Sequence, residues 1–152
     1  MARFLDAFKH RITKGQVSLP RAFVEALKGA KDSRRLYMIY SPNNYLLLAP
    51  ADVYAKMLTQ VKDRTYAHKD QFNRALRMFA ANTHELALDS QDRLVIPDRF
   101  REKAGLAGDE IVFVGCTDYI EIHDAARWES IVEDDDAIFR DLMGDLTPGG
   151  GE

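Results

Sequence analysis

The hydrophobic and polar positions of this chain follow one order of features twice. Each time, a polar turn leads into a short apolar strand, a proline opens a helix, two apolar runs form a hairpin, and a further helix follows. The first copy reads ITKGQVSLPRAF and then YLLLAPADVY, and the second reads DSQDRLVIPDRF and then YIEIHDAARW. Pro20 recurs as Pro97 and Phe23 as Phe100, each 77 residues later. Few residues are identical, so the repeat is one of pattern.

Each copy predicts the same kinds of element at corresponding places. In the first copy the expected strands are 7–12, 17–19, 36–40 and 45–48, and the expected helices begin at Pro20 and Ala51. In the second copy the expected strands are 84–88, 94–96, 110–115 and 119–122, and the expected helices begin at Pro97 and Ala125. The last helix is expected to end at Val132, a helix over 71–81 joins the copies, and the Gly/Pro-rich segment 147–152 is predicted to be disordered.

Two copies of a pattern favour a particular architecture. A solenoid usually needs about three or more repeats, whereas two copies suit a pseudo-twofold body in which each half completes the other. The predicted fold class is α+β, with a mainly β core and helices around it. The expected units are a first repeat at 5–62, a connecting helix at 63–83, a second repeat at 84–133, and an acidic, partly disordered tail at 134–152.

Charge is distributed unevenly along the chain. Its 152 residues carry a net charge of −3, which taken alone argues against a nucleic-acid partner. Residues 1–35, however, hold nine Lys/Arg against three acids, and residues 129–152 hold eight acids against Arg140 alone. Such asymmetry suggests a basic face and an acidic face or tail. A polyanion-binding N-terminal region and an ordinary solvated surface are both compatible with it.

Composition excludes several classes of protein. The 46% hydrophobic and 30% charged residues are ordinary for a soluble globular domain. No apolar run reaches the roughly 20 residues that span a bilayer, and the N-terminal MARFLDAFKHR lacks the apolar core of a secretory signal. We therefore expect a cytoplasmic protein without a membrane partner. The single cysteine, Cys116, allows no intrachain disulfide and is expected to be a small buried strand residue.

Candidate chemistry for an enzyme or a cofactor is sparse. The four histidines show no metal-ligand spacing, and no Gly-rich phosphate loop occurs. The acids Asp134 to Asp136 are more simply a solvated charge run than a cation site. No nucleophile, base or metal constellation can be assembled, so we expect no enzyme activity and no cofactor, metal or small-molecule ligand.

The second turn contains the motif with the most specific chemical meaning, Asp89-x-x-x-Arg93. These two residues lie on the two arms of a tight turn, where the carboxylate can hold the guanidinium or cap backbone N–H groups. An arginine at the mouth of a hairpin can reach a phosphate or a guanine edge. The alternative is a local ion pair that only stabilises the turn.

This motif, followed by a strand, a proline-led helix and Gly-Leu, carries a resemblance to a known family. DSQDRLVIPDRFREKAGL with VFVGCTDYIEIHDAARWE closely resembles the second half of MraZ, a family of bacterial transcriptional regulators in the SpoVT/AbrB-like superfamily. ITKGQVSLPRAF with LYMIYSPNNYLLLAPADVY resembles the first half, so the resemblance spans roughly residues 5–133. It implies tandem swapped-hairpin halves in a β-barrel-like body, and ring-shaped homo-oligomers whose turns face promoter DNA with direct repeats.

The first turn departs from the family pattern, in which each half has an Asp-x-x-x-Arg motif. Asp89 and Arg93 match the second motif, but in the first Ile12 stands at the Asp position and Gln16 at the Arg position. Gln16 could hydrogen-bond an adenine but cannot neutralise a phosphate. Charge at this turn must come from elsewhere, and the local candidates are Lys9, His10, Arg11 and Lys14. In the second turn, Asp92 would repel a nearby phosphate unless it is turned away.

Together these observations predict a cytoplasmic, nucleoid-associated transcription regulator, and the MraZ resemblance implies a repressor of a cell-division or cell-wall operon. The expected DNA-binding residues are Lys9, Arg11, Lys14, Gln16, Asp89 and Arg93, with Asp89 orienting Arg93. The alternative is a structural or protein-interaction module that keeps the fold but has lost DNA recognition, and Ile12 and Gln16 favour it. A single-copy AbrB-like antitoxin is disfavoured by the internal repeat.

Overall fold

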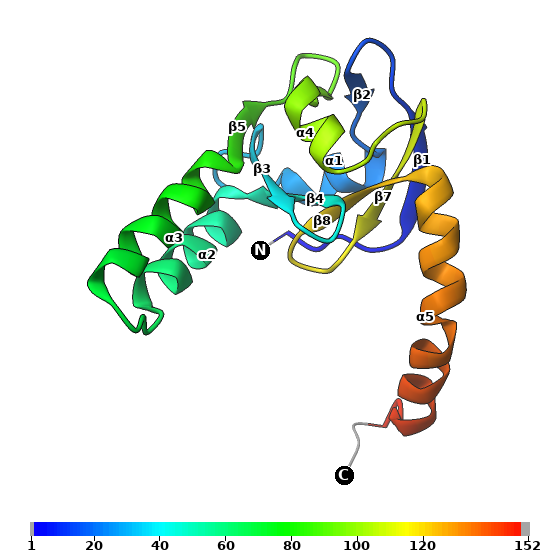
Figure 1. The fold of residues 1–152 in the computed structure, drawn as a ribbon. Helices are drawn as coiled ribbons and strands as arrows, with labels where there is room; N and C mark the ends of the chain where they lie inside the picture. Colours follow the sequence, from blue (N-terminus) through cyan, green and yellow to red (C-terminus); the bar gives the residue numbers. More distant parts are fainter. Residues whose placement is uncertain (1, 150–152) are drawn as a thin grey trace.

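The elements of the fold occur in the same order in both repeats. A computed structural model describes residues 2–149 (Figure 1). The strands are β1 (Ala7–Arg11), β2 (Gln16–Ser18), β3 (Arg35–Ser41), β4 (Tyr45–Pro50), β5 (Thr83–Ala87), β6 (Arg93–Val95), β7 (Glu110–Gly115) and β8 (Ile120–Asp124). The helices are α1 (Arg21–Leu27), α2 (Ala51–Asp63), α3 (Lys69–Ala81), α4 (Asp98–Lys103) and α5 (Ala125–Asp145). The predicted α+β fold class is confirmed.

The two proline-led helices form where the sequence predicts them. Pro20 and Pro97 each stand immediately before a helix, with φ of −53° and −58°. A proline ring holds φ near these values, and its missing N–H costs nothing at a helix start. One turn later, Phe23 and Phe100 each bury a ring that is only 1% exposed. The two short helices thus anchor corresponding aromatic rings in the core.

The strands of the main sheet are arranged symmetrically. The sheet has six strands in the order β1-β7-β8-β4-β3-β5. β1 of the first repeat pairs with β7 of the second, and β5 of the second repeat pairs with β3 of the first. The order therefore reads the same when the two repeats are exchanged, as expected for a dimer-like body built from one chain.

The register at the centre of the molecule follows the same symmetry. β2 and β6 form a separate antiparallel ribbon in which Val17 faces Leu94, and β4 and β8 pair with Leu47 facing Glu121. Val17 and Leu94 are repeat counterparts 77 residues apart, and Leu47 and Glu121 are counterparts 74 residues apart. Each ladder is thus centred on a pair of equivalent residues, which is what a twofold relation requires.

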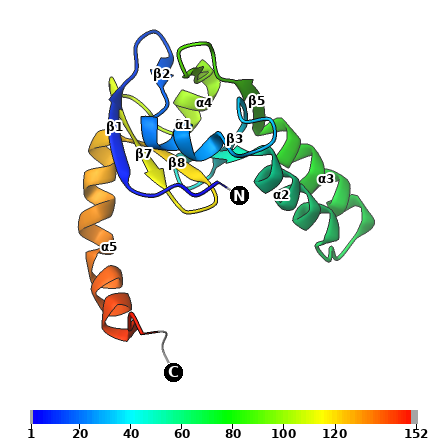
Figure 2. The ribbon, with the colours of Figure 1, turned by 180° about the vertical axis from the view of Figure 1, so that it is seen from behind.

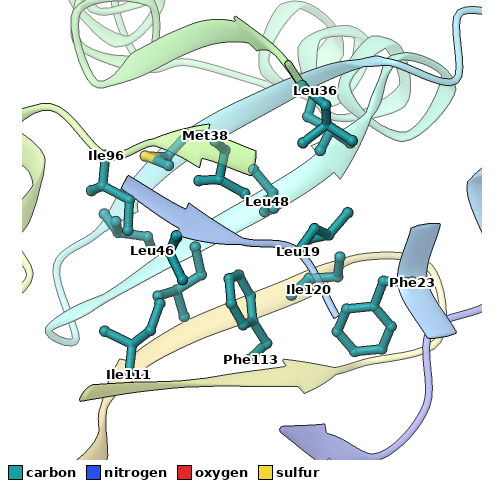
Figure 3. Close-up of a cluster of buried hydrophobic side chains, with 14 of the residues drawn as sticks. Leu19, Phe23, Leu36, Met38, Leu46, Leu48, Ile96, Ile111, Phe113 and Ile120 are labelled. Carbon is teal, nitrogen blue, oxygen red and sulfur yellow. The ribbon is translucent and has the colours of Figure 1, made fainter. Parts of the chain in front are cut away.

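The hydrophobic core lies between the six-stranded sheet and the β2–β6 ribbon. Leu19 and Ile96, which directly follow the two ribbon strands, extend toward Leu46 and Phe113 of the sheet (Figure 3). Phe113 and Leu46 are fully buried, and Leu19 and Ile96 are at most 3% exposed. Burial of side chains of this size contributes about 1.5–3 kcal/mol each, so the contact between ribbon and sheet is a major part of the stability.

The barrel-like closure implied by the family resemblance is not formed. Within residues 2–149, β1 and β5 are the two edges of an open sheet and do not pair with each other. The ribbon and the helices α1 and α4 lie across one face of that sheet (Figures 1 and 2). Because these elements already bury the apolar face, closing the strands into a barrel is not needed to remove it from water.

The last helix is longer than predicted. α5 runs from Ala125 to Asp145 instead of ending at Val132, so the acids at 133–136 lie within it. Ile138, Phe139 and Leu142 continue the helical spacing of apolar residues beyond those acids, and charged residues on a solvated face do not end a helix. Residues 134–145, placed above in an acidic tail, are therefore helical. Residues 150–152 of the segment predicted to be disordered lie outside the described residues.

Candidate nucleic-acid interface

The β2–β6 ribbon places the two hairpin turns at one end of the body. The first turn joins β1 to β2 and the second joins β5 to β6, and both lie at the top of Figures 1 and 2. Backbone bonds tie each turn to the other repeat: Ile96 N–H donates to the Gly15 carbonyl at 2.8 Å, and Leu19 N–H donates to the Asp92 carbonyl at 3.0 Å. The turns are therefore held together on one rigid support.

In the second turn, Asp89 organises both the backbone and Arg93. Asp89 N–H donates to the Arg93 carbonyl and Asp92 N–H to the Asp89 carbonyl, each at 3.0 Å. Asp89 Oδ1 accepts from the backbone N–H of Gln91 at 2.8 Å and of Arg93 at 2.9 Å. Asp89 Oδ2 accepts from Arg93 Nε at 2.8 Å. The carboxylate thus caps the turn and holds the guanidinium, as the sequence predicts.

These bonds determine what Arg93 can do. They favour the ionised carboxylate and hold the pKa of Asp89 below its usual value, with the backbone N–H of Arg93 as the largest cause. Only Nε of Arg93 is engaged by Asp89, and the side chain is 39% exposed. Its two terminal nitrogens have no hydrogen-bond partner among residues 2–149. Arg93 therefore presents a planar pair of donors whose base is fixed, which suits a phosphate or a guanine edge.

Arg34 is a member of this site that sequence reasoning missed. Its Nη1 donates to Asp92 Oδ1 at 2.7 Å, and its Nη2 donates to the Asp89 carbonyl. The ion pair neutralises Asp92, so the carboxylate that would have repelled a phosphate is compensated. Arg34 stands 58 residues before Asp92 in the chain, just ahead of β3. The sequence signal at Arg34 was only its place in the basic segment 1–35.

The first turn is one residue shorter than the second. Thr13 and Gln16 exchange backbone bonds of 2.9 and 3.0 Å around Lys14 and Gly15. Those two central residues have φ of 53° and 77°, the left-handed pair that a two-residue hairpin turn requires. In the second turn three residues, Ser90 to Asp92, occupy the corresponding space, and only Asp92 has a positive φ, of 60°. The two turns therefore cannot be aligned without a gap.

This gap corrects the alignment of the first motif. Thr13, and not Ile12, occupies the place of Asp89, because both donate their N–H to the residue that closes the turn. Ile12 corresponds instead to Leu88, and each of these two side chains is 7% exposed in the core. Gln16 does correspond to Arg93. The first turn thus lacks both the carboxylate and the guanidinium, and Thr13 is too short to hold a partner at the Gln16 position.

The basic candidates of the first half occupy different places. Lys14 lies at the tip of the first turn and forms no ion pair within residues 2–149. Lys9 and Arg11 share the exposed face of β1, and Lys9 lies about 13 Å along the strand from Thr13 at about 3.3 Å per residue. Arg11 lies 4.0 Å from Asp109, with both side chains exposed. His10 is turned inward, where its Nδ1 lies 2.7 Å from the Ser18 carbonyl oxygen.

Comparison with known proteins assigns the family. The family model described as "MraZ protein, putative antitoxin-like" matches residues 78–142. A protein named Transcriptional regulator MraZ from Anaeromyxobacter sp. (strain Fw109-5) is 32% identical over 87% of this chain and 90% of its own length. The chain belongs to the MraZ family. Proteins of the same name from Salinispora arenicola and Acetivibrio thermocellus are 29% and 26% identical, over 90% and 87% of this chain and 91% and 88% of their own lengths.

The match to the MraZ family model extends through most of α5. It begins within α3 and covers the second turn with Asp89 and Arg93, and its last residue is Leu142. Because the model continues well past Val132, the part of α5 that the sequence patterns did not predict belongs to the region shared with the MraZ family.

Outside the two turns, the side chains offer little chemistry. No helix among residues 2–149 is long and apolar enough to cross a bilayer. No group of three or more His, Cys, Asp or Glu in that range is arranged to hold a metal ion. Burial, and then the nearby Glu121, raises the pKa of the Cys116 thiol to about 11. Its thiolate population at neutral pH is therefore very small, and a thiol in this state is a poor nucleophile.

Asp89→Ala tests the contribution of the second turn to stability. A carboxyl group whose pKa is lowered by folding stabilises the native state above its unfolded pKa of about 3.9, and this contribution is lost as pH falls through the folded value. We expect the variant to melt at a lower temperature than the parent at pH 7, and the difference to shrink as the pH falls below about 4. Thermal denaturation of both proteins from pH 7 to pH 3 measures this.

Asp89→Asn separates the two roles of the side chain. Its amide oxygen can still accept from the Gln91 and Arg93 backbone N–H groups, while the ion pair to Arg93 Nε is lost. The asparagine variant should therefore melt between the parent and Asp89→Ala. A melting difference that is constant from pH 7 to pH 3 would show that the carboxylate does not stabilise this turn.

Proposed function

We propose that this protein is a transcriptional regulator that binds promoter DNA through its two hairpin turns. The names of its MraZ relatives support regulation of transcription. The observation that carries the proposal is the state of Arg93, whose Nε is fixed by Asp89 while its terminal nitrogens stay available at an exposed turn. A pre-positioned guanidinium loses little side-chain entropy when it binds, and it matches phosphate and guanine acceptors in pairs.

The two turns take different roles in this proposal. Arg93 supplies the directed contact, Asp89 orients it, and Arg34 compensates the charge of Asp92. Lys14 supplies a point charge to a phosphate at the tip of the first turn, and Gln16 reads a base edge or a phosphate without adding charge. Lys9 and Arg11 extend the positive surface along β1 to the flanking backbone. Because both turns lie at one end of the body, they can contact one duplex together (Figure 1).

Several turns acting together complete the proposed mechanism. Counting Arg34, Asp89, Asp92 and Arg93, the second turn carries no net charge, so one subunit alone has a weak electrostatic hold on DNA. A ring-like homo-oligomer would present many turns to direct repeats in the promoter and would gain avidity without new contacts. We infer exchanged hairpins between the two halves, a cytoplasmic and nucleoid-associated protein, and repression of a cell-division or cell-wall operon.

A second candidate is a structural or protein-interaction module that keeps the MraZ fold without binding DNA. Gln16 in place of an arginine and Thr13 in place of an aspartate favour it, because the first turn then lacks the ion pair of the second. This candidate predicts an intact assembly with no affinity for its own promoter, even at low salt.

The salt dependence of promoter binding separates the two candidates. For binding to duplex DNA, log Kobs falls linearly with log salt, with a slope of about −0.9 for each phosphate that is neutralised. We expect a steep slope for the parent and a slope smaller by about 1 for each engaged subunit in Lys14→Ala. Arg140→Ala removes a cation on α5, distant from both turns in sequence, and should leave the slope unchanged. Fluorescence anisotropy with the promoter of the protein's own operon, at 50–300 mM salt on the order used for such titrations, measures the slopes.

The outcome decides between the candidates directly. Absence of binding at the lowest salt, with the assembly intact, would favour the interaction module. Binding with the same slope in Lys14→Ala would remove the first turn from the DNA interface but would keep the second.

A further inference from the structure

Helix α5 carries an apolar face that its own chain leaves exposed. The large hydrophobic side chains along it are 49–68% exposed: Val132, Ile138, Phe139, Leu142 and Met143, followed by Leu146 just beyond its end. At about 100° per residue, these positions share one side of the helix with Trp128 and Ile131. The opposite side carries Ser130, Glu133, Ala137 and Arg140. A continuous exposed apolar stripe of this kind marks a surface that another element covers.

The fold keeps the rest of its own chain away from this face. The contacts of α5 with the body are made to β7 and β8, near the start of the helix. From there it projects away from the sheet, while the α2–α3 hairpin projects from the other side of the body (Figures 1 and 2). The cover for the α5 face must therefore come from another molecule.

The α2–α3 hairpin carries a groove of matching character. The groove between the two helices is lined by Met57, Val61, Tyr66, Ala75 and Phe79, with Gln60 and Arg64 at its polar positions. No residue of either helix is fully buried, although both helices have a strongly apolar side. The hairpin is thus a second projecting element with an apolar surface left open to solvent.

The charges of the two projecting elements are complementary. α5 holds seven acids against two arginines, a net charge of −5. The segment from Ala51 to Ala81, which makes up the α2–α3 hairpin, holds six Lys/Arg against three acids, a net charge of +3. Two copies of the same acidic helix would repel each other, so this balance favours α5 against the hairpin over α5 against α5.

The internal repeat supplies an independent reason for this pairing. α2 is the counterpart of α5, and Tyr54 of α2 occupies the place of Trp128. Tyr54 stacks on Phe79 of α3 with ring centroids 5.8 Å apart. The face of α2 that packs on a following helix thus corresponds to the face of α5 that stays open. In the part of the chain that the structure describes, no helix follows α5 to cover it.

We propose that α5 of one copy seats its apolar face in the α2–α3 groove of a second copy. The inference rests on the homo-oligomer of the proposed function and names the two surfaces that build it. Since these surfaces lie on different sides of one subunit, the contact is head-to-tail, and repetition of it closes a ring. Asp135, an acid within the apolar face of α5, pairs across the interface with Arg64 of the partner subunit. Both turns stay outside the contact and free for DNA (Figure 1).

Two variants break the two sides of the interface separately. Phe139→Asp places a charge in the apolar face of α5, and Ala75→Trp fills the groove. Each is expected to reduce the assembly to single chains in sedimentation velocity, where the parent forms a higher oligomer. Ala137→Asp adds the same charge on the opposite side of α5 and is the matched control, expected to assemble as the parent does. Far-UV circular dichroism of each variant checks that the fold is retained.

A mixture of the two variants tests the head-to-tail geometry. Ala75→Trp keeps an intact α5 and Phe139→Asp keeps an intact groove, so an equimolar mixture retains one good interface for each pair of chains. The expected product is a dimer that grows no further. A mixture that stays monomeric, or an assembly that survives either single variant, would overturn the proposal. A parent that sediments as a single chain would overturn it as well.

Charge exchange tests the polar contact without disturbing the apolar packing. Asp135→Arg and Arg64→Asp should each weaken the oligomer, and the double variant should recover it in part, because the pair is then restored with reversed signs. The outcome is separable from the function of the turns. Loss of assembly in these variants with failure of the parent to bind promoter DNA would keep the interface and reject the DNA-binding proposal, and the reverse result would do the opposite.

Discussion

Arg93→Ala is expected to abolish or greatly weaken promoter binding while the protein stays folded and assembled. A bidentate arginine contact to a base is worth about 1–3 kcal/mol of discrimination, which corresponds to about a 5- to 140-fold change in Kd at one turn. An oligomer that uses several turns at once loses this contribution at each of them, so the total loss is larger. Little stability should be lost, since the Arg93 side chain is 39% exposed and its ion pair with Asp89 is partly solvated.

Matched variants show which property of Arg93 matters. Arg93→Lys keeps the charge but loses the planar fork, so it should retain non-specific binding and lose preference for the promoter. Asp89→Asn leaves Arg93 in place but unanchored and should give an intermediate affinity. Arg140→Ala removes an arginine that is paired with Asp136 on α5 and should bind as the parent does. Anisotropy titrations with promoter and scrambled duplexes at one salt concentration compare the four proteins. Unchanged promoter affinity in Arg93→Ala would remove the second turn from the interface.

Leu94→Ala is expected to give the reverse result, with a large loss of stability and no direct loss of a DNA contact. Leu94 is 1% exposed and faces Val17, itself 2% exposed, at the centre of the β2–β6 ribbon. Truncation of a buried leucine costs about 2–5 kcal/mol, because the cavity that it leaves closes only in part. At about 2–4 °C per kcal/mol for a chain of this size, the melting temperature should fall by about 4–20 °C.

Leu5→Ala is the matched control for this substitution. Leu5 is 62% exposed, so its truncation should change the free energy of unfolding by less than about 0.5 kcal/mol. Both variants should be melted at the same protein concentration as the parent, because assembly raises the apparent stability. A loss below about 1 kcal/mol in Leu94→Ala would mean that the ribbon is not packed against the core as the structure has it.

The sequence predicted the repeat and the elements within it because these depend on near neighbours. Pro20 and Pro97 open helices through their own fixed φ, and Phe23 and Phe100 follow at the spacing of one helical turn. The Asp89 carboxylate reaches the Gln91 and Arg93 N–H groups within one turn, so this part of the site could be predicted from five consecutive residues.

Residue spacing alone misled at the first turn. A constant offset of 77 residues aligns Ile12 with Asp89, yet the shorter loop makes Thr13 its counterpart and sends Ile12 into the core. Loop length is set by which residues accept a positive φ, here Lys14 and Gly15 against Asp92 alone. The gap became visible only when the backbone bonds of both turns were compared.

The extent of α5 and the role of Arg34 were missed for related reasons. The acids at 133–136 resemble a solvated linker until the apolar stripe on the other side of the same helix is seen in three dimensions. Arg34 meets Asp92 across 58 residues of chain, and nothing in the local pattern around either residue announces the partner.

The sequence by itself determined the α+β class, the order of the elements, the two proline-led helices, the core phenylalanines and the Asp89–Arg93 motif. Each of these follows from periodicity, turn chemistry or backbone restriction within a few residues. Only the tertiary structure decided the open sheet with its symmetric register, the pairing of Arg34 with Asp92, and the projection of α5 and the α2–α3 hairpin from different sides. These depend on which distant segments pack together, and that choice is made by the burial of the whole apolar surface at once.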